Sequence, residues 1–294
     1  MAHRKPRHRN PSVSRSAPQP VPAAAPRPTP AAAPKPAPAA APASPAAASR
    51  DRVTGGVWLY GVHAVAAAIA NPKRRIYRLL VTNDGHAALE QALGGRPALS
   101  FELVERGDIA RALPAGAVHQ GIAAYGEALQ SPALEDLIAA AGPEAVIVVL
   151  DQVTDPHNVG AIVRTAAAFN AAGVVLPRDH APPESGAMAK AASGALDRVK
   201  IARVTNLARA LRALAEAGFW VIGLDAGADR ELAAVKPAQG RVALVLGGEG
   251  RGLRRLTRET CDELARLPMT SAVESLNVSN AAAVALYELR RNAG

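Results

Sequence analysis

The sequence predicts an α/β protein with a small and a larger folded unit behind a Pro- and Ala-rich tail. Three observations support this prediction. Runs such as "AVIVVL" and "RVALVL" are continuously apolar, which is typical of parallel strands covered on both faces. Ala- and Leu-rich segments with helical periodicity alternate with these runs. The first 50 residues differ in composition from all that follows, which separates the tail from the folded units.

The tail, residues 1–52, is expected to be disordered. Its first 50 residues hold 13 of the 24 prolines and eight of the 34 Lys and Arg residues, but no Asp or Glu. Such a composition prevents a helix and leaves little to bury. Most of the net charge of +9 therefore belongs to the tail. Two interpretations stay open, an electrostatic tether for RNA and a solubilising extension. An organellar transit peptide is disfavoured, because the prolines prevent an amphipathic helix.

Residues 53–126 predict a small α/β unit. It begins with an extended entry and a helix over 62–70, followed by a strand over 76–81. The remaining elements are expected as helices near 86–93 and 108–113 and as strands near 99–104 and 119–126. Residues 127–144 are expected to form a linker, helical between about 134 and 141.

Residues 145–294 predict a parallel-sheet domain. The expected strands are 146–150, 173–176, 199–204, 219–224, 242–246 and 264–267. The expected helices are 159–170, 184–192, 207–217, 252–259 and 277–291. In open α/β sheets, ligands bind outside the carboxyl ends of the strands. The polar loops after Leu150, Leu246 and Leu267 are therefore where a site is expected.

The first of these loops opens the segment "DQVTDPHNVGAIVRTAAAF". Asp155 and Asn158 are typical helix-capping residues, and His157 is interpreted as a turn residue because no nucleophile or carboxylate pattern accompanies it. Arg164 follows Asn158 by six residues in an otherwise apolar helix. Buried arginines need partners, so Arg164 is either a site residue or one that extends its charged end to solvent.

The second loop, "LVLGGEGRGLRR", is a Gly-rich turn after a strand. It is not a Walker A loop, and its glycines do not have dinucleotide-binding spacing, which argues against a nucleotide-dependent dehydrogenase. It also places Glu249 in the turn, where a carboxylate repels phosphate but suits an amino or cationic group. A ligand that carries adenosine and a sulfonium is consistent with this turn.

The third loop lies in "LPMTSAVESLNVSNAAAV". A helix begins after Pro268 and the irregular residues that follow it, with Ser275, Asn277, Ser279 and Asn280 at its start. One capping residue suffices for a helix, so the additional polar groups predict part of a site. The three loops hold no Cys/His cluster and no serine-triad pattern, and this set suits the binding and positioning of a reactive cofactor.

Composition excludes several classes of protein. A single Cys excludes an internal disulfide and a zinc ribbon. No apolar run is long enough for a membrane span, and no apolar region of a secretory signal follows the basic start, so a soluble cytoplasmic protein without bound metal is expected. Only three Phe, two Trp and four Tyr are present, which disfavours a base-stacking platform for RNA.

The three loop segments resemble, in order and spacing, the three motifs of the SpoU family of SPOUT-class RNA ribose 2′-O-methyltransferases. "DHAPPESGAMAKAASGAL" matches the segment between the first two motifs. "YGVHAVAAAI" and "HQGIAA" look like the small substrate-binding domain of many members. The resemblance covers residues 56–291 and is nearest to the subgroup that methylates a guanosine ribose in large-subunit rRNA. Asn170 and Asn280 depart from the residues that are frequent there.

The resemblance implies a trefoil knot in the parallel-sheet domain, S-adenosylmethionine as cofactor and a homodimer. It implies cofactor contacts at Gly247, Leu267 and Leu276. It implies a catalytic set of Asn158, Arg164, Glu249, Ser275 and Asn277. Arg164 is expected to grip a phosphate and stabilise the developing alkoxide, because a guanidinium stays protonated at ordinary pH. Ser275 and Asn277 are expected to orient the hydroxyl or cofactor, while Asn158 and Glu249 fix the loops.

Two alternatives remain within this resemblance. One is a tRNA ribose 2′-O-methyltransferase, against which the small domain argues. The other is an RNA-binding protein that has lost catalysis, against which the intact motif residues, Arg164 above all, argue.

Overall fold

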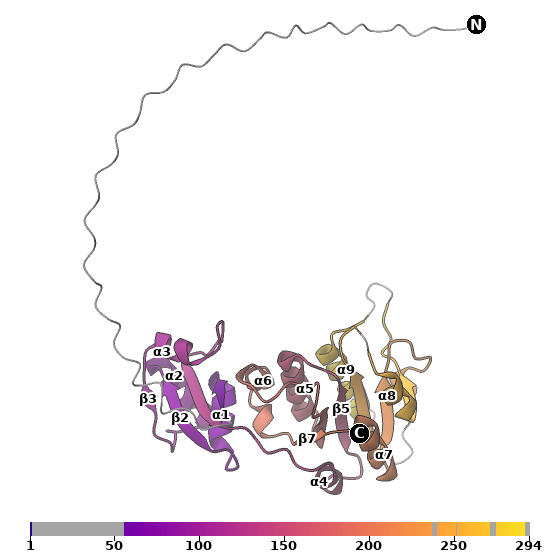
Figure 1. Cartoon of the computed structure of the whole chain (residues 1–294), viewed down its shortest axis with the longest axis horizontal. Coiled ribbons are helices and arrows are strands. Elements are labelled where there is room, and N and C mark those ends of the chain that lie inside the picture. The colour runs from indigo at the N-terminus through magenta and orange to yellow at the C-terminus, as the bar shows by residue number, and fades with distance from the viewer. Residues whose placement is uncertain (2–55, 237–239, 251, 271–274, 292–294) are drawn as a thin grey trace, which may run out of the picture. The chain divides into compact units, whose positions relative to one another are not determined.

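The computed structural model describes Met1 and residues 56–236, 240–250, 252–270 and 275–291 (Figure 1). The predicted tail, apart from Met1, lies outside the described residues. The described elements belong to two domains, both within the contact unit 51–294.

The small domain is built on a four-stranded sheet in the order β1-β4-β2-β3. Its strands are β1 (Gly56–Tyr60), β2 (Ile76–Val81), β3 (Glu102–Leu103) and β4 (Ile122–Glu127). β4 pairs antiparallel with β1 and β2, and β3 adds in parallel to β2. The segment expected as an extended entry is therefore an edge strand, with Leu59 opposite Ala124.

Three helices cover this sheet. They are α1 (Val62–Ala70), α2 (Asn83–Leu93) and α3 (Arg106–Ala112). Side chains alternate between the two faces, as the period of a strand requires. Leu59 and Leu79 join the core beneath α1 and α2, whereas Tyr60 and Leu80 pack with Ile109 of α3. The strand expected over 99–104 is only the two residues of β3.

The larger domain has a six-stranded, wholly parallel sheet in the order β10-β8-β9-β5-β6-β7. The strands are β5 (Val146–Asp151), β6 (Gly173–Pro177), β7 (Ile201–Val204), β8 (Trp220–Leu224), β9 (Val242–Gly247) and β10 (Glu263–Ala265). The predicted α/β class and parallel sheet are confirmed.

Helices cover both faces of the sheet (Figure 1). α5 (Pro156–Ala168), α6 (Gly186–Ala192) and α9 (Val278–Arg291) lie on one face. α4 (Leu134–Ala139), α7 (Leu207–Glu216) and α8 (Arg255–Thr260) lie on the other. Val148 and Leu150 of β5 join the first core and Ile147 and Val149 the second, which explains why this strand is apolar throughout.

Two short 3₁₀ turns complete the elements, η1 (Ala195–Asp197) and η2 (Leu232–Ala234). The helix expected over 252–259 begins only at Arg255. Gly252 has a left-handed φ of 62°, and Leu253 is buried in the second core, so the chain turns before the helix starts.

A buried arginine connects the two domains. Arg74, between α1 and β2, forms ion pairs with Glu184 at 2.5 Å and with Asp197 at 2.6 Å, and its side chain is fully buried. Arg74 Nη1 also donates to the carbonyl of Glu127. Among the described residues, no helix is both long and apolar enough to cross a membrane.

Candidate active site

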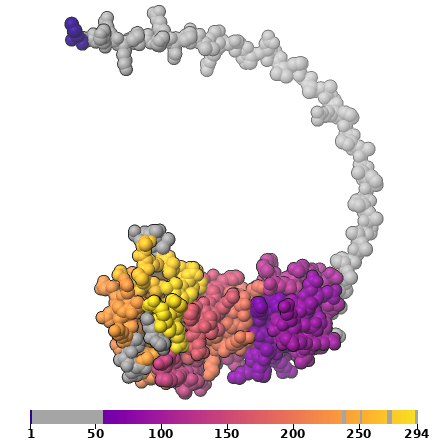
Figure 2. All heavy atoms as spheres, turned by 180° about the vertical axis from the view of Figure 1, so that it is seen from behind, coloured from indigo at the N-terminus to yellow at the C-terminus, as the bar shows by residue number. Residues whose placement is uncertain are grey.

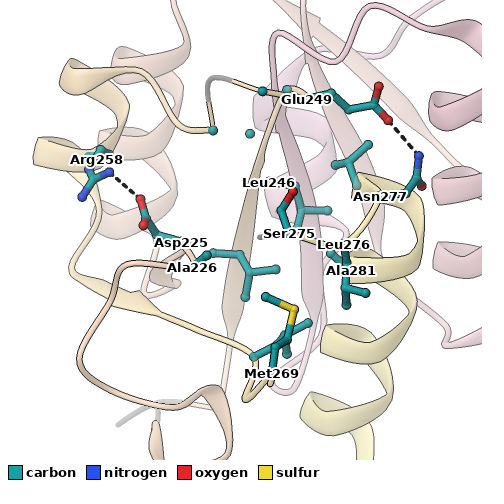
Figure 3. Close-up of a pocket in the computed structure, with 17 residues that line it drawn as sticks. Asp225, Ala226, Leu246, Glu249, Arg258, Met269, Ser275, Leu276, Asn277 and Ala281 are labelled. Carbon is teal, nitrogen blue, oxygen red and sulfur yellow. Dashed lines mark hydrogen bonds and ion pairs between the residues drawn. The ribbon is translucent and has the colours of Figure 1, made fainter. Parts of the chain in front are cut away.

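A cavity of about 550 Å³ opens at the carboxyl ends of β8, β9 and β10. Its wall combines three loops and the start of α9, as Figure 3 shows. The apolar lining residues include Leu224, Leu246, Leu267, Met269, Leu276 and Ala281. The loops after Leu246 and Leu267 therefore do meet at one site, as the sequence predicts.

The Gly-rich turn after β9 forms one side of this cavity. A Cβ at Gly247 would lie 2.1 Å from the carbonyl carbon of Gly252, and a Cβ at Gly248 would lie 2.4 Å from the carbonyl oxygen of Gln152. Larger residues at these two positions would collide with main-chain atoms. The turn is therefore folded tightly, and its glycines present backbone to the cavity.

Three predicted site residues form one hydrogen-bonded cluster beside the cavity. Glu249 Oε1 accepts from Asn158 Nδ2 at 2.8 Å and from Asn277 Nδ2 at 2.7 Å. Asn277 Nδ2 also donates to Asn158 Oδ1 at 3.0 Å. The cluster joins α5, the turn after β9 and the start of α9, which are 91 and 28 residues apart along the chain.

Asn277 and Ser279 account for part of the surplus of polar residues at the start of α9. Its Oδ1 accepts from the backbone N of Ser279 at 2.9 Å and from Ser279 Oγ at 2.6 Å. The oxygen therefore caps the helix while the amide nitrogen joins the cluster. One asparagine can serve both roles because its acceptor and donor groups lie at opposite sides of the amide.

The start of α5 positions Asn158. Asp155 caps the helix by accepting from the backbone N of His157 at 2.9 Å, and Pro156 occupies the first turn. Asn158, on that turn, is 8% exposed. His157 is exposed, in line with its interpretation as a turn residue.

Arg164 lies apart from this cluster. It is exposed on α5, does not line the cavity, and makes no hydrogen bond or ion pair with another described residue. Six residues along a helix turn the side chain to a direction about 120° away from that of Asn158. The first motif therefore presents its two predicted catalytic residues on different sides of α5.

The remaining predicted residues line the cavity. Ser275 and Leu276 precede α9, Leu267 follows β10, and Gly247 ends β9. Figure 3 shows Ser275 in the middle of the view, between Asp225 and Asn277. The segment 271–274 of the third loop lies outside the described residues.

An ion pair that sequence reasoning missed lies across the cavity from the cluster (Figure 3). Asp225 follows β8 and pairs through Oδ2 with Arg258 of α8 at 2.5 Å, and both residues line the cavity. The position of Asp225 directly after an apolar strand was a signal of the same kind as those used for the other loops.

No group of three or more His, Cys, Asp or Glu side chains among the described residues could hold a metal ion. The site instead offers apolar walls, a backbone turn, amides and a carboxylate. Such groups can bind and orient an organic cofactor and a polar substrate.

Comparison with known proteins identifies the class. The SpoU rRNA Methylase family model matches residues 145–287. The RNA 2′-O ribose methyltransferase substrate-binding model matches residues 58–132. The chain belongs to the SpoU rRNA methylase family, which confirms the resemblance read from its motifs.

Individual members of this family are similar to the chain over most of its length. The chain is 42% identical over 241 residues to the 23S rRNA (guanosine-2′-O-)-methyltransferase RlmB of Xylella fastidiosa, covering 80% of this chain and 96% of the relative. It is 40% identical over 245 residues to the protein of the same name from Escherichia coli K12, covering 79% and 97%.

Solved structures share the fold. The AdoMet-bound rRNA methyltransferase from Sinorhizobium meliloti aligns with a TM-score of 0.65 at 25% identity, over 81% of this chain and 88% of that chain. The SpoU methyltransferase AviRb from Streptomyces viridochromogenes, in complex with AdoMet, aligns with a TM-score of 0.67 at 24% identity, over 81% and 91%.

Proposed function

We propose that this protein methylates the 2′-oxygen of a guanosine ribose in large-subunit rRNA, with S-adenosylmethionine as methyl donor. The observation that carries the proposal is the cavity at the ends of β8, β9 and β10 together with the Asn158–Glu249–Asn277 cluster at its edge. The relatives named for this reaction align along both domains.

The residues of the cavity fit S-adenosylmethionine. Leu246, Leu267 and Leu276 offer apolar surface for an adenine ring, and the turn at Gly247 offers backbone groups without a side chain in the way. Glu249 places a carboxylate at the same wall, which suits a cationic ligand. When bound, S-adenosylmethionine supplies an electrophilic methyl group on a sulfonium.

The chain's own part in the reaction is positioning and charge stabilisation. Asn158, Glu249 and Asn277 hold three loops in one arrangement, and Ser275 orients the ribose hydroxyl or the cofactor. Holding reactants in line supplies a large share of the rate in such reactions. Guanidinium groups are poor bases, so we do not assign Arg164 as the base, and the hydroxyl proton passes to solvent water as the 2′-oxygen takes the methyl group. Arg164 grips an RNA phosphate and stabilises the negative charge that develops on the 2′-oxygen.

We assign RNA binding to the small domain, and we assign large-subunit rRNA as the substrate. The match of residues 58–132 to the substrate-binding model supports the first assignment, and the relatives named for 23S rRNA support the second. The trefoil knot implied by the family resemblance remains part of this proposal.

The proposal includes a homodimer formed through α9. Val284 and Tyr287 are 47% and 55% exposed, and they lie one helical turn apart on the same face. The C-terminal segment, yellow in Figure 2, reaches the surface of the molecule in that view. An exposed aromatic and an aliphatic side chain on one helix face favour a protein contact, and a second copy would bring further groups to the exposed Arg164.

The test is a methylation assay with methyl-labelled S-adenosylmethionine on unmodified large-subunit rRNA and, separately, on bulk tRNA. Label mapped to a guanosine 2′-oxygen in rRNA is expected. Label in tRNA alone would keep the chemistry and overturn the substrate. No label on either RNA, despite cofactor binding, would instead favour an RNA-binding protein without catalysis.

A further inference from the structure

The Gly-rich turn from Gly247 to Arg254 is held at two points by a single neighbouring segment. This segment, residues 151–158, runs from the end of β5 to the first turn of α5. Asn158 holds the tip of the turn through Glu249. The opposite end of the segment contacts the base of the turn through Asp151, a residue to which no role has yet been given.

Asp151 is a fully buried carboxylate, 0% exposed, in the middle of the parallel sheet. Its Oδ2 accepts from the backbone N of Arg254 at 2.9 Å, and its Oδ1 accepts from Arg254 Nε at 2.6 Å. The two residues are 103 positions apart in the sequence. A buried charge with this pairing is costly unless its partner stays in place, so the pair holds the end of the turn in one position.

The backbone of the same segment holds the beginning of the turn. Gly248 N donates to the carbonyl of Asp151 at 2.9 Å, and Gly252 N donates to the carbonyl of Gly248 at 3.0 Å. The turn is thus closed on itself and attached to Asp151 at both of its ends. Its glycines at 247, 248, 250 and 252 line the cavity.

We infer that Asp151 and Arg254 are positioning residues of the cofactor pocket, which hold the Gly-rich turn closed and thereby set the affinity for S-adenosylmethionine. This inference rests on the proposed function. Neither residue lines the cavity, so the pair acts through the turn and not by contact with the cofactor. Removing the pair leaves the turn free to open, and the cofactor must then bear the entropy of ordering it.

Arg254→Ala is the first test, because it removes the side-chain half of the contact with Asp151 and keeps the backbone N–H from which Asp151 also accepts. Arg255→Ala is the matched control. Arg255 is the next residue, it is exposed, and its ion pair with Glu259 at 2.8 Å lies within α8. Titration calorimetry with S-adenosylmethionine is expected to give a dissociation constant roughly tenfold higher for Arg254→Ala and one within about twofold of wild type for Arg255→Ala.

Two further measurements separate positioning from a general loss of stability. In the methylation assay, Arg254→Ala raises the KM for S-adenosylmethionine more than it lowers kcat, and Arg254→Lys, which restores a cation beside Asp151, recovers part of the affinity. Hydrogen exchange at the amide of Gly248 accelerates in Arg254→Ala and in Asp151→Asn while the amides of β5 stay protected.

Equal affinities of Arg254→Ala and Arg255→Ala would overturn the inference and leave the proposed function standing. A wild-type protein that does not bind S-adenosylmethionine would overturn the proposed function itself. The hydrogen-exchange comparison needs no cofactor, so it still tests whether Asp151 holds the turn in that case.

Discussion

Two parts of the predicted catalytic set differ in how completely the chain builds them. Asn158, Glu249 and Asn277 converge from three elements and satisfy one another's hydrogen bonds. Arg164 lies on the same helix as Asn158, yet it is exposed and has no described partner. One side of α5 therefore carries Asn158, whose hydrogen bonds are made within the cluster, and another side carries Arg164, which is exposed to solvent.

We propose that this difference separates cofactor binding, by the cluster, from chemistry, by Arg164. A cluster whose hydrogen bonds are made within one chain is ready before any ligand arrives, as a cofactor pocket should be. An exposed guanidinium gains a partner only when one is brought to it, and RNA phosphate is such a partner. The cluster is therefore expected to act on the cofactor side of the site and Arg164 on the substrate side.

The largest effect is expected for Arg164→Ala. Loss of a group that stabilises developing negative charge lowers kcat by roughly 10²- to 10³-fold. Cofactor affinity stays close to wild type, because Arg164 does not line the cavity. Single-turnover methylation and calorimetry measure the two quantities. Arg212→Ala, an exposed arginine on the opposite face of the sheet, is the control and should keep normal turnover. A normal rate for Arg164→Ala would remove this residue from the catalytic set.

The next effect is expected for Glu249→Gln. The carboxylate accepts two amide hydrogen bonds through one oxygen, and a hydrogen bond to a charged group contributes about 1.5–3 kcal/mol. Its loss should weaken cofactor binding tenfold or more, as measured by calorimetry. Glu259→Gln, which alters only an exposed pair within α8, should bind as wild type does. If Glu249→Gln instead lowered kcat and left cofactor affinity unchanged, the assignment of the cluster to cofactor binding and of Arg164 to catalysis would be wrong.

A moderate effect is expected for Tyr287→Asp on α9. A buried charge in the proposed dimer contact should shift the protein toward monomer in light scattering and lower turnover by roughly tenfold, with cofactor binding retained. Leu256→Asp is the control, since Leu256 is 51% exposed on α8 and lies away from α9. Full activity of a monomeric Tyr287→Asp variant would show that Arg164 needs no second subunit.

The smallest effect compares the thiol reactivity of Cys261, at the end of α8, with that of a thiol placed at position 164. Burial, and then the charges of Asp262 and Asp151, raise the pKa of Cys261 from 9.0 to about 12. The thiolate, which is the reactive form, is therefore scarce in the folded protein well above pH 8. Ellman's reagent at pH 8 should leave native Cys261 unmodified and label it on unfolding. Arg164→Cys in a Cys261→Ala background should react at the rate of a free thiol. Fast labelling of native Cys261 would mean that the packing between the end of α8 and Gly223 of β8 opens readily.

Local sequence patterns were sufficient to predict most of the helices and strands. The helix at 62–70 and the strand at 76–81 have the predicted bounds, because each is continuous in propensity, the helix ends before Asn71 and Pro72, and the strand ends where Thr82 caps α2. The start of α8 was wrong, because Gly252 adopts a left-handed φ and Leu253 turns into the core. Edge strand β1 was missed as a strand, since its identity depends on pairing with β4, more than 60 residues away.

The sequence by itself determined the class of the protein, the parallel sheet and two of the loops that line the cavity, those after Leu246 and Leu267, because apolar strands and motif spacing are local properties of the chain. Only the tertiary structure decided which side chains meet. Asp151 reaches Arg254, and Asp225 reaches Arg258, because β9 lies between β5 and β8 in the sheet. Arg164 stays apart from Asn158 because a helix turns by about 100° per residue. Strand order is set by the packing of the whole domain, so contacts that depend on it cannot be obtained from periodicity.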